Sequence, residues 1–502
     1  MKKNKTFDRI LLSLVGFIGV YFLIRLIDFS KIVSYFPVHV TGDIPSYMAN
    51  LFFLNNYGLY EIVPHWFNGM MLFLRYPPGW HYFTLPIYYL TKNITLATYI
   101  SVVLIFSLIL LAIYKLGKSQ GISPIRRVAF FLLMFGNAIA IGNFLRLGRA
   151  PELFGWLWFI ITTSLILWYK DRRIDSKFLW IIPTYAILIL SHSPLAVFFH
   201  SLLLLPMLFL IKNNLRERVI VATSTIMGLV LSAFWWLPFI IDNLRNRALS
   251  NTHFGARMLG LEEQPTLNFV LNNLATSAII IFLWLSFYVY WQHRNKSKRE
   301  LLFFSPILLL SALLFFRATF VLPIINAVYP DVQVIGYLFF ALYFLFKTPL
   351  RKNAQKIFLF IIAIFILSNI TVSAVHTPWF PTYTDIEYKT FDLIPLIKGK
   401  FLMLTSPYDT SYPNAYYAYA AVFHNTYSVF GMGTEGLMPR YYTPIREINR
   451  LAKEGDCQNL KELSQKIQLT EIITYDELCI SLKKCGLEEV KTNEPACLYR
   501  IN

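Results

Sequence analysis

Two carboxylates stand in polar segments that separate long apolar runs of the chain. Asp43 follows the first apolar run, and Glu152 ends the segment 146–152, which also carries Arg146 and Arg149. Ionisable groups at the boundary of apolar segments are costly and usually have a function. A carboxylate there can act as a general base or bind a metal, and an arginine can neutralise a phosphate. The structural alternative is an Arg149–Glu152 ion pair that only holds helices together.

Two further residues could support these groups. His192 interrupts an apolar stretch at 190–194 and could bind a metal or hydrogen-bond a phosphate, although a lone histidine more often has a structural role. Arg317 borders a later connection between apolar runs and is a second candidate for holding a phosphate.

The apolar runs themselves indicate a membrane protein. Of 502 residues, 56% are hydrophobic and only 15% are charged, and the mean hydropathy is +0.51, a balance that soluble domains do not carry. Runs near the length that crosses a hydrocarbon core of about 30 Å recur to residue 375. We predict about eleven helical spans, near 8–28, 95–115, 128–145, 153–169, 178–192, 194–211, 219–240, 271–291, 301–320, 332–346 and 357–375.

The basic residues predict the orientation of these spans, because cytoplasmic loops are rich in Lys and Arg. The N-terminus and five segments between spans are basic: Lys115–Arg127, Lys170–Lys177, Lys212–Arg218, Arg294–Arg299 and Lys347–Lys356. All can be cytoplasmic together only if the number of spans is odd, which places the C-terminal part outside the cell. The net charge of +18 comes mostly from these loops and does not indicate nucleic acid, although a basic rim favours anionic lipid.

The first outer loop, about 31–95, is long enough to suggest a function. Its aromatic segment 77–90 is too short to cross a membrane and is predicted to be a helix in the outer interface. His65, Trp66 and Tyr76 are weak candidates for contact with a sugar or an acceptor. Aromatic anchoring at the interface explains Trp66 better.

The C-terminal part, 376–502, alternates β-rich runs with helical patterns and is predicted to be a small extracytoplasmic α/β domain. Strands are predicted near 401–405, 427–430, 471–476 and 496–500, with a helix at 477–484. Glu435 lies in a glycine-containing stretch, 431–436, and could reach back to an acceptor.

All four cysteines fall in this C-terminal part: Cys457, Cys479, Cys485 and Cys497. An even number in an oxidising compartment allows two disulfides in any of three pairings. Four buried thiols are the alternative, and the spacing is not that of a zinc site.

The predicted first outer loop contains Gly42-Asp43, the segments 64–69 and 75–78, and the aromatic segment 77–90. With these features it resembles the first outer loop of the GT-C membrane glycosyltransferases. More narrowly, the chain resembles the membrane family labelled pyruvoyl-tetrahydropterin-synthase-related, whose label is no indication of pterin chemistry. The likeness covers most of the membrane region and, more loosely, the C-terminal part.

The resemblance implies a GT-C fold and an enzyme that transfers a sugar from a polyprenyl-phosphate donor to a glycan, lipid or protein acceptor on the outer face, with inversion. Asp43 then matches the first-loop acidic position and Glu152 the second-loop one, and the family often carries a histidine at His192. A divalent metal, Mg²⁺ or Mn²⁺, on these three residues is compatible with the resemblance. Many members carry two adjacent acidic residues at the first position, whereas Ile44 follows Asp43 here.

Two other classes of function fit a polytopic chain. A lipid or glycan transporter could use Arg149, Glu152 and His192 as a substrate path, although no internal repeat is visible. A non-catalytic assembly protein could bind a partner through the C-terminal domain. Only the enzyme requires Asp43 for activity in an intact, inserted protein.

Overall fold

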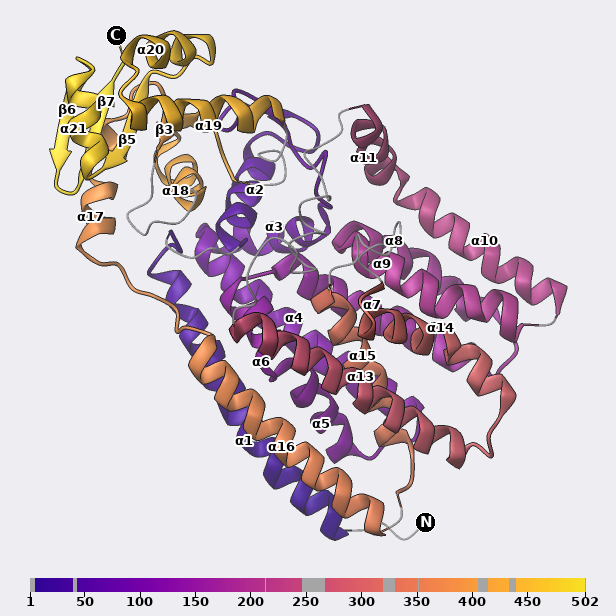
Figure 1. Ribbon diagram of the computed structural model, residues 1–502. Helices are drawn as coiled ribbons and strands as arrows, with labels where there is room; N and C mark the ends of the chain where they lie inside the picture. Colours follow the sequence, from indigo (N-terminus) through magenta and orange to yellow (C-terminus); the bar gives the residue numbers. More distant parts are fainter. Residues whose placement is uncertain are drawn as a thin grey trace.

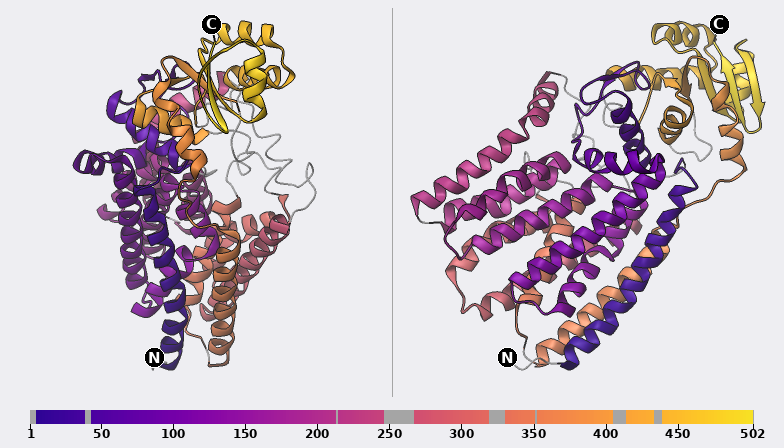
Figure 2. Two further views of the ribbon diagram at one scale, coloured as in Figure 1. Left: turned by 90° about the vertical axis from the view of Figure 1, so that its left-hand side faces the viewer. Right: turned by 180° about the vertical axis from the view of Figure 1, so that it is seen from behind.

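The computed structural model describes residues 5–38, 43–212, 214–245, 267–318, 330–350, 352–404, 414–432 and 439–501. A bundle of long helices makes up most of the molecule, and a small domain with a β-sheet lies at one end of it (Figure 1). The N-terminus lies at the opposite end (Figure 2). Glu435 lies outside the described residues.

The bundle is built from the apolar runs of the sequence. Its helices are α1 (Lys5–Phe29), α4 (Ile94–Ser119), α5 (Pro124–Phe135), α6 (Ala138–Ala140), η2 (Ile141–Arg146), α7 (Ala150–Tyr169), η3 (Ser176–Trp180), α8 (Ile181–Ser191), α9 (Ser193–Phe199), η4 (His200–Leu204), η5 (Met207–Ile211), α10 (Leu215–Leu231), α11 (Ala233–Arg245), α13 (Leu267–His293), α14 (Lys298–Phe315), α15 (Pro330–Lys347) and α16 (Lys352–His376). Within the described residues, each of the eleven predicted spans falls mainly on one of these helices or on a run of adjoining ones.

Among the described residues, six helices are long and apolar enough to cross a membrane, or up to eight if each of two bent pairs is one span. One bent pair joins Pro124–Phe135 to Ala138–Arg146 at 54°, and the other joins Leu215–Leu231 to Ala233–Asp242 at 69°. The segments 176–191 and 332–347 are shorter apolar helices. The prediction of eleven crossings therefore remains a prediction.

The basic segments gather at one end of the bundle, which we call the basic end. Four contacts join them there: Lys170 with Glu300, Lys212 with Arg172, Lys347 with Gln120, and Arg126 with Asp8. That these segments share one side of the membrane, as the preference of basic residues for one face suggests, stays a prediction.

The first loop lies at the other end, which we call the loop end (Figure 1). It contains η1 (Ser30–Val33), α2 (Ile44–Asn56), the two-stranded β1 (Ile62–Val63) and β2 (Met70–Met71), and α3 (Gly79–Thr91). α3 is the helix predicted from the aromatic segment 77–90. The loop ends at Asn93, whose side chain accepts a hydrogen bond from Leu96 N at 3.0 Å and so caps α4.

The C-terminal domain contains a five-stranded sheet in the order β4-β3-β5-β7-β6. β3 is parallel to β4 and β5, whereas β7 is antiparallel to β5 and β6. The strands are β3 (Lys400–Met403), β4 (Tyr427–Ser428), β5 (Glu471–Tyr475), β6 (Glu488–Asn493) and β7 (Ala496–Arg500). The helices are α17 (Asp385–Phe391), η8 (Ile394–Leu396), α18 (Asn414–His424), α19 (Pro439–Glu454), α20 (Cys457–Lys466) and α21 (Glu477–Lys484).

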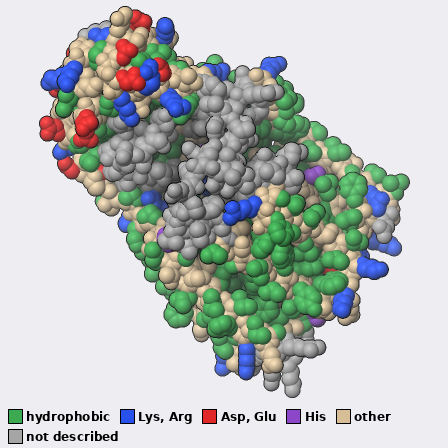
Figure 3. All heavy atoms as spheres, in the orientation of Figure 1, with side chains coloured by type: hydrophobic (Ala, Val, Ile, Leu, Met, Phe, Trp, Pro, Cys, Tyr) green, Lys and Arg blue, Asp and Glu red, His purple; other side chains and the backbone are tan. Residues whose placement is uncertain are grey.

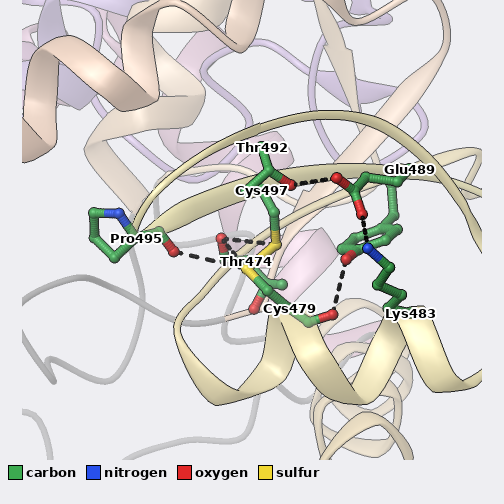
Figure 4. Close-up of a disulfide and its surroundings, with 8 residues drawn as sticks. Thr474, Cys479, Lys483, Glu489, Thr492, Pro495 and Cys497 are labelled. Carbon is green, nitrogen blue, oxygen red and sulfur yellow. Dashed lines mark hydrogen bonds and ion pairs between the residues drawn. A yellow bond between two sulfur atoms is a disulfide. The ribbon is translucent and has the colours of Figure 1, made fainter.

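Two disulfides connect the helices and strands of this domain. Cys457 bonds to Cys485, and Cys479 bonds to Cys497. The second bond ties α21 to β7 (Figure 4). Tyr499 Oη donates a hydrogen bond to the carbonyl oxygen of Cys479. Of the three pairings that the sequence allowed, the structure contains this one.

The surface reflects the two parts of the molecule. On the face seen in Figure 3, apolar side chains are spread over the helical bundle, whereas charged side chains of both signs gather on the C-terminal domain. Exposed large apolar residues are found along α1, α10 and α16, among them Phe17, Ile226 and Phe360. A bundle with apolar side chains on its outside is suited to lipid.

Candidate active site

Asp43 begins helix α2 at the loop end. Its backbone N–H donates to the carbonyl oxygen of Leu147 at 2.9 Å, which ties the first loop to the segment before α7. Its side chain is 52% exposed, so the carboxylate is open to a reactant. Pro45 in the first turn suits a helix start, since the amide hydrogen that proline lacks would have no partner there.

Gly148 sets how closely the two segments approach. Its φ of +68° is a left-handed conformation that favours glycine, and a Cβ there would lie 2.5 Å from Cβ of Ile44. Ile44 directly follows Asp43, so this contact places Asp43 beside the residues that follow Gly148. The glycine of the Arg-Leu-Gly-Arg segment therefore serves both the turn and the close packing.

Arg149 lies against two carboxylates. Its Nε atom is 3.6 Å from Oδ2 of Asp43, and its Nη1 atom is 3.6 Å from Oε2 of Glu152. The Glu152 side chain is only 3% exposed, and its Oε1 accepts a hydrogen bond from Nε1 of Trp156 at 3.3 Å. The structure thus brings together the two predicted acidic residues through one predicted arginine.

Tyr47 and Tyr76 border the carboxylates, and Tyr47 was not identified from the sequence as a site residue. The hydroxyl groups of Tyr47 and Tyr76 are hydrogen-bonded at 2.9 Å. Burial, together with the negative charge of Asp43, raises the pKa of Tyr47 well above its usual range. Burial also raises the pKa of Tyr76, and the charges of Asp43 and Glu152 add to this effect. Both rings therefore keep their hydroxyl hydrogens at neutral pH. Asp43 and Tyr47 are four residues apart at a helix start, and residues with this spacing are neighbours on the helix surface. The sequence could therefore have indicated that Tyr47 lies near Asp43.

His192 lies at the break between α8 and α9, beside α7. The contact is close, because a Cβ on Gly155 would lie 2.8 Å from Cβ of His192. Gly155 is three residues beyond Glu152 on the same helix, so His192 packs near the buried carboxylate and is itself largely buried.

The other two predicted phosphate ligands lie elsewhere. Arg146 lies near α1 and the residues after α16, with its Cζ atom 5.9 Å from the ring centroid of Phe380. Arg317 is exposed in the turn that follows α14 and has a φ of 60°. The two arginines of the segment 146–152 thus have different surroundings.

His65 and Trp66 connect the first loop to the C-terminal domain. His65 is fully buried, hydrogen-bonds through Nε2 to Oδ1 of Asn425 at 2.8 Å, and stacks on Tyr427. Trp66 is also fully buried, and its Nε1 donates to the carbonyl oxygen of Tyr417 at 3.3 Å. In this structure both rings form part of the contact between the first loop and the C-terminal domain.

The first helix turn after Asp43 also contacts the C-terminal domain. Ser46 Oγ donates to the carbonyl oxygen of Met432 at 3.2 Å. The chain segment after β4 is thereby brought to the start of α2, close to the candidate site.

The described residues do not form a metal cage. No three His, Cys, Asp or Glu side chains among them come together as a metal site needs. Asp43 and Glu152 face the guanidinium of Arg149, which takes the place that a cation between the carboxylates would occupy. A divalent metal on Asp43, Glu152 and His192 stays a prediction, and no chemical step is assigned to one.

Comparison with known proteins gives structural neighbours only. No family model matches the sequence, and no curated protein matches it significantly. The oligosaccharyltransferase of Archaeoglobus fulgidus in its apo form is similar with a TM-score of 0.55 at 10% sequence identity, covering 91% of this chain and 69% of that one. The chain therefore shares its fold with this oligosaccharyltransferase, which has a GT-C fold.

A second structure supports the same likeness. The archaeal oligosaccharyltransferase AglB of Archaeoglobus fulgidus, in complex with an inhibitory peptide and a dolichol-phosphate, gives a TM-score of 0.52 at 11% identity with the same coverage. Together with the apolar helices, this fold makes the chain a multi-pass membrane protein. The narrower resemblance to the pyruvoyl-tetrahydropterin-synthase-related family is not shown by a family model or by these two structures.

Proposed function

We propose that this chain is an inverting membrane glycosyltransferase that moves a sugar from a polyprenyl-phosphate carrier to an acceptor outside the cell. The observation that carries the proposal is the convergence of Asp43 and Glu152 on Arg149 at the loop end. The GT-C fold supports it, as does the neighbour structure that contains a dolichol-phosphate and a peptide. Activity is inferred from the site, because a shared fold alone does not establish it.

The exposed carboxylate is assigned the role of base. An acceptor hydroxyl or amide attacks the anomeric carbon, and Oδ of Asp43 takes the proton that the acceptor loses. The bond from the anomeric carbon to the phosphate oxygen breaks, and its electron pair stays on the polyprenyl phosphate. Attack from the side opposite the phosphate inverts the configuration.

The remaining groups hold this base in place. Arg149 fixes Asp43 against the buried Glu152, whose other oxygen is held by Trp156. Arg149 also places a positive charge where the leaving phosphate becomes more negative. A charge-assisted contact there stabilises the transition state. His192 lies near Glu152 and is proposed to support the donor side, and Arg317 remains a proposed phosphate contact from the turn after α14.

The C-terminal domain is proposed to present the acceptor. The contact between Ser46 and Met432 brings this domain to the start of α2. Glu435 lies a few residues beyond Met432 in the sequence and is proposed to take part in acceptor recognition. The proposed acceptor is a glycan, a lipid or a protein.

Sugar transfer from radiolabelled polyprenyl-phosphate sugars tests the proposal. Purified protein in lipid is assayed as wild type and as Asp43→Asn, with divalent metal and with chelator. Asp385→Asn is the matched control, because it changes an exposed, ion-paired aspartate near the start of a helix in the C-terminal domain. Turnover lost only in Asp43→Asn supports the enzyme and names the donor. No turnover with any donor in a folded sample would favour a transporter or an assembly protein.

A further inference from the structure

A second basic cluster lies at the loop end, between α1 and the segment that follows α16. The guanidinium of Arg146 lies over Phe380, and its charge interacts with those of Arg25 and Asp28 on α1. α1 and α16 run side by side along most of their length (Figures 1 and 2). Three segments far apart in the sequence therefore converge at Phe380.

Asp28, the carboxylate that the described residues bring to this cluster, is already engaged. Oδ1 of Asp28 pairs with Lys31 Nζ at 2.8 Å, and Oδ2 accepts a hydrogen bond from the backbone N–H of Phe380 at 2.7 Å. Lys31 also donates to the carbonyl oxygen of Phe380. One negative charge thus faces three positive charges, including those of Arg25 and Arg146.

Arg25 is held by neutral groups. Its Nη1 and Nη2 atoms each donate at 3.0 Å, to the carbonyl oxygens of Thr377 and Pro378. The side chain also lies over the ring of Trp379, 4.5 Å from the centroid. Carbonyls and a ring orient the guanidinium but do not remove its charge, so Arg25 and Arg146 repel each other across the cluster.

Both arginines have donors without an acceptor. Nε of Arg25, and Nε and Nη1 of Arg146, are buried and have no hydrogen-bond partner among the residues that the structure describes. Arg25 is only 2% exposed. Buried donors are nearly always paired, and unpaired donors on two neighbouring cations indicate the place of an anion.

The surroundings indicate that this anion belongs to a lipid. Leu23 and Ile27 on α1, and Val375 on α16, expose large apolar surfaces within a turn or two of the cluster. Trp379 is partly exposed beside them, as aromatic residues are at the level of lipid head groups. A phosphate bound by the arginines would leave its hydrocarbon chain on these apolar side chains.

We propose that Arg25 and Arg146 form a binding site for the phosphate group of a lipid, separate from the Asp43–Arg149–Glu152 site. The half-buried Arg146 and the 41% exposed Lys31 side chain leave the cluster open at the loop end. The site holds a lipid phosphate next to the reaction centre, since Arg146 and Arg149 are joined by a single turn of chain. The proposed lipid-phosphate site rests on the proposed function only for the choice of polyprenyl phosphate as one probe.

Binding in lipid nanodiscs of neutral phosphatidylcholine tests this site without any turnover. Three probes are titrated separately onto the full chain: a polyprenyl monophosphate, phosphatidylglycerol and inorganic phosphate. Arg146→Gln is expected to weaken binding of the lipid phosphates about tenfold or more, because it removes charge-assisted hydrogen bonds, and Arg146→Lys is expected to restore part of it. Arg126→Gln is the matched control, since Arg126 lies over Phe7 and pairs with Asp8 at the basic end.

The outcomes separate the sources of phosphate. Tighter binding of polyprenyl phosphate than of phosphatidylglycerol would assign the site to the carrier, and equal binding would assign it to anionic membrane lipid. Inorganic phosphate binding as tightly as either lipid would overturn the lipid assignment. Binding that Arg146→Gln leaves unchanged, or no binding of any probe to a folded protein, would overturn the site. Binding is measured without turnover, so a failure of the proposed transfer reaction remains distinct from a failure of this site.

Discussion

Oδ2 of Asp43 lies 3.6 Å from Nε of Arg149, although the two residues belong to loops far apart in the sequence. The backbone hydrogen bond from Asp43 N to Leu147 O holds the same two segments together. The base of the proposed reaction is thus positioned from two sides, by its own backbone and by a side chain.

Replacing Arg149 by Gln is therefore expected to reduce sugar transfer by about 100-fold or more, the scale on which loss of one well-placed charge-stabilising group acts. Arg149→Lys should recover only part of the activity, because an ammonium group is a point charge and cannot span two carboxylates as a guanidinium does. Initial rates on a fixed amount of folded protein give the measurement. Arg450→Gln, which breaks an exposed pair with Glu447 in the C-terminal domain, should keep full activity. Equal rates for wild type and Arg149→Gln would contradict this role.

Gly148→Ala is expected to lower both stability and activity. The left-handed φ costs an alanine about 1–2 kcal/mol, and the added Cβ would press on Ile44 and shift Asp43. Gly121→Ala is the matched control, since its φ is +75° but nothing lies within 4 Å of the added atom. Both variants should lose thermal stability, whereas only Gly148→Ala should lose turnover per folded molecule. Loss of turnover in both would show that strain alone, and not the contact with Ile44, is responsible.

The helices could be predicted because length and hydropathy decide them. Each apolar run of the sequence became a helix, and the aromatic segment 77–90 became α3. In the C-terminal domain, the strands β3, β5 and β7 were predicted, since their runs are apolar and buried. Strand β6 was not, because it is an edge strand of mostly charged and polar residues that mainly face solvent.

The site could be predicted only in part. Asp43, Glu152 and Arg149 were each identified as ionisable residues beside apolar runs, but their contact depends on how α2 approaches α7, which no local pattern specifies. Arg146 and Arg149 were each candidates to neutralise the phosphate, and the π-helical turn η2 and the left-handed Gly148 give the two side chains different surroundings. The role of His65 could not be foreseen, because its partner Asn425 is distant in the sequence.

The two disulfides are expected to stabilise the C-terminal domain by about 3–4 kcal/mol each, because each closes a loop of the unfolded chain, of 28 residues for Cys457–Cys485 and 18 for Cys479–Cys497. The double variant Cys457→Ser/Cys485→Ser should therefore unfold this domain at a lower temperature, which hydrogen exchange of β5 and β7 would report. Mass spectrometry of the alkylated, unreduced protein checks the pairing. Four alkylated cysteines in freshly purified protein would contradict it.

Acid is expected to loosen the contact between the first loop and the C-terminal domain. Burial lowers the pKa of His65 below its usual value, although the hydrogen bond to Asn425 opposes this shift. An unfolded histidine titrates near pH 6.5, so below that pH the separated state binds a proton that the packed state excludes. Stability of the contact is thus full above about pH 6.5 and is lost as the pH falls through the lower pKa of the folded state. Hydrogen exchange of α18 and β4 at pH 7.5 and pH 5 measures this loss of stability.

His65→Phe should keep the stacking on Tyr427 but lose the hydrogen bond, giving faster exchange at both pH values and less dependence on pH. His376→Phe, at the exposed end of α16, should behave like wild type. An unchanged pH dependence in His65→Phe would mean that another group controls the contact.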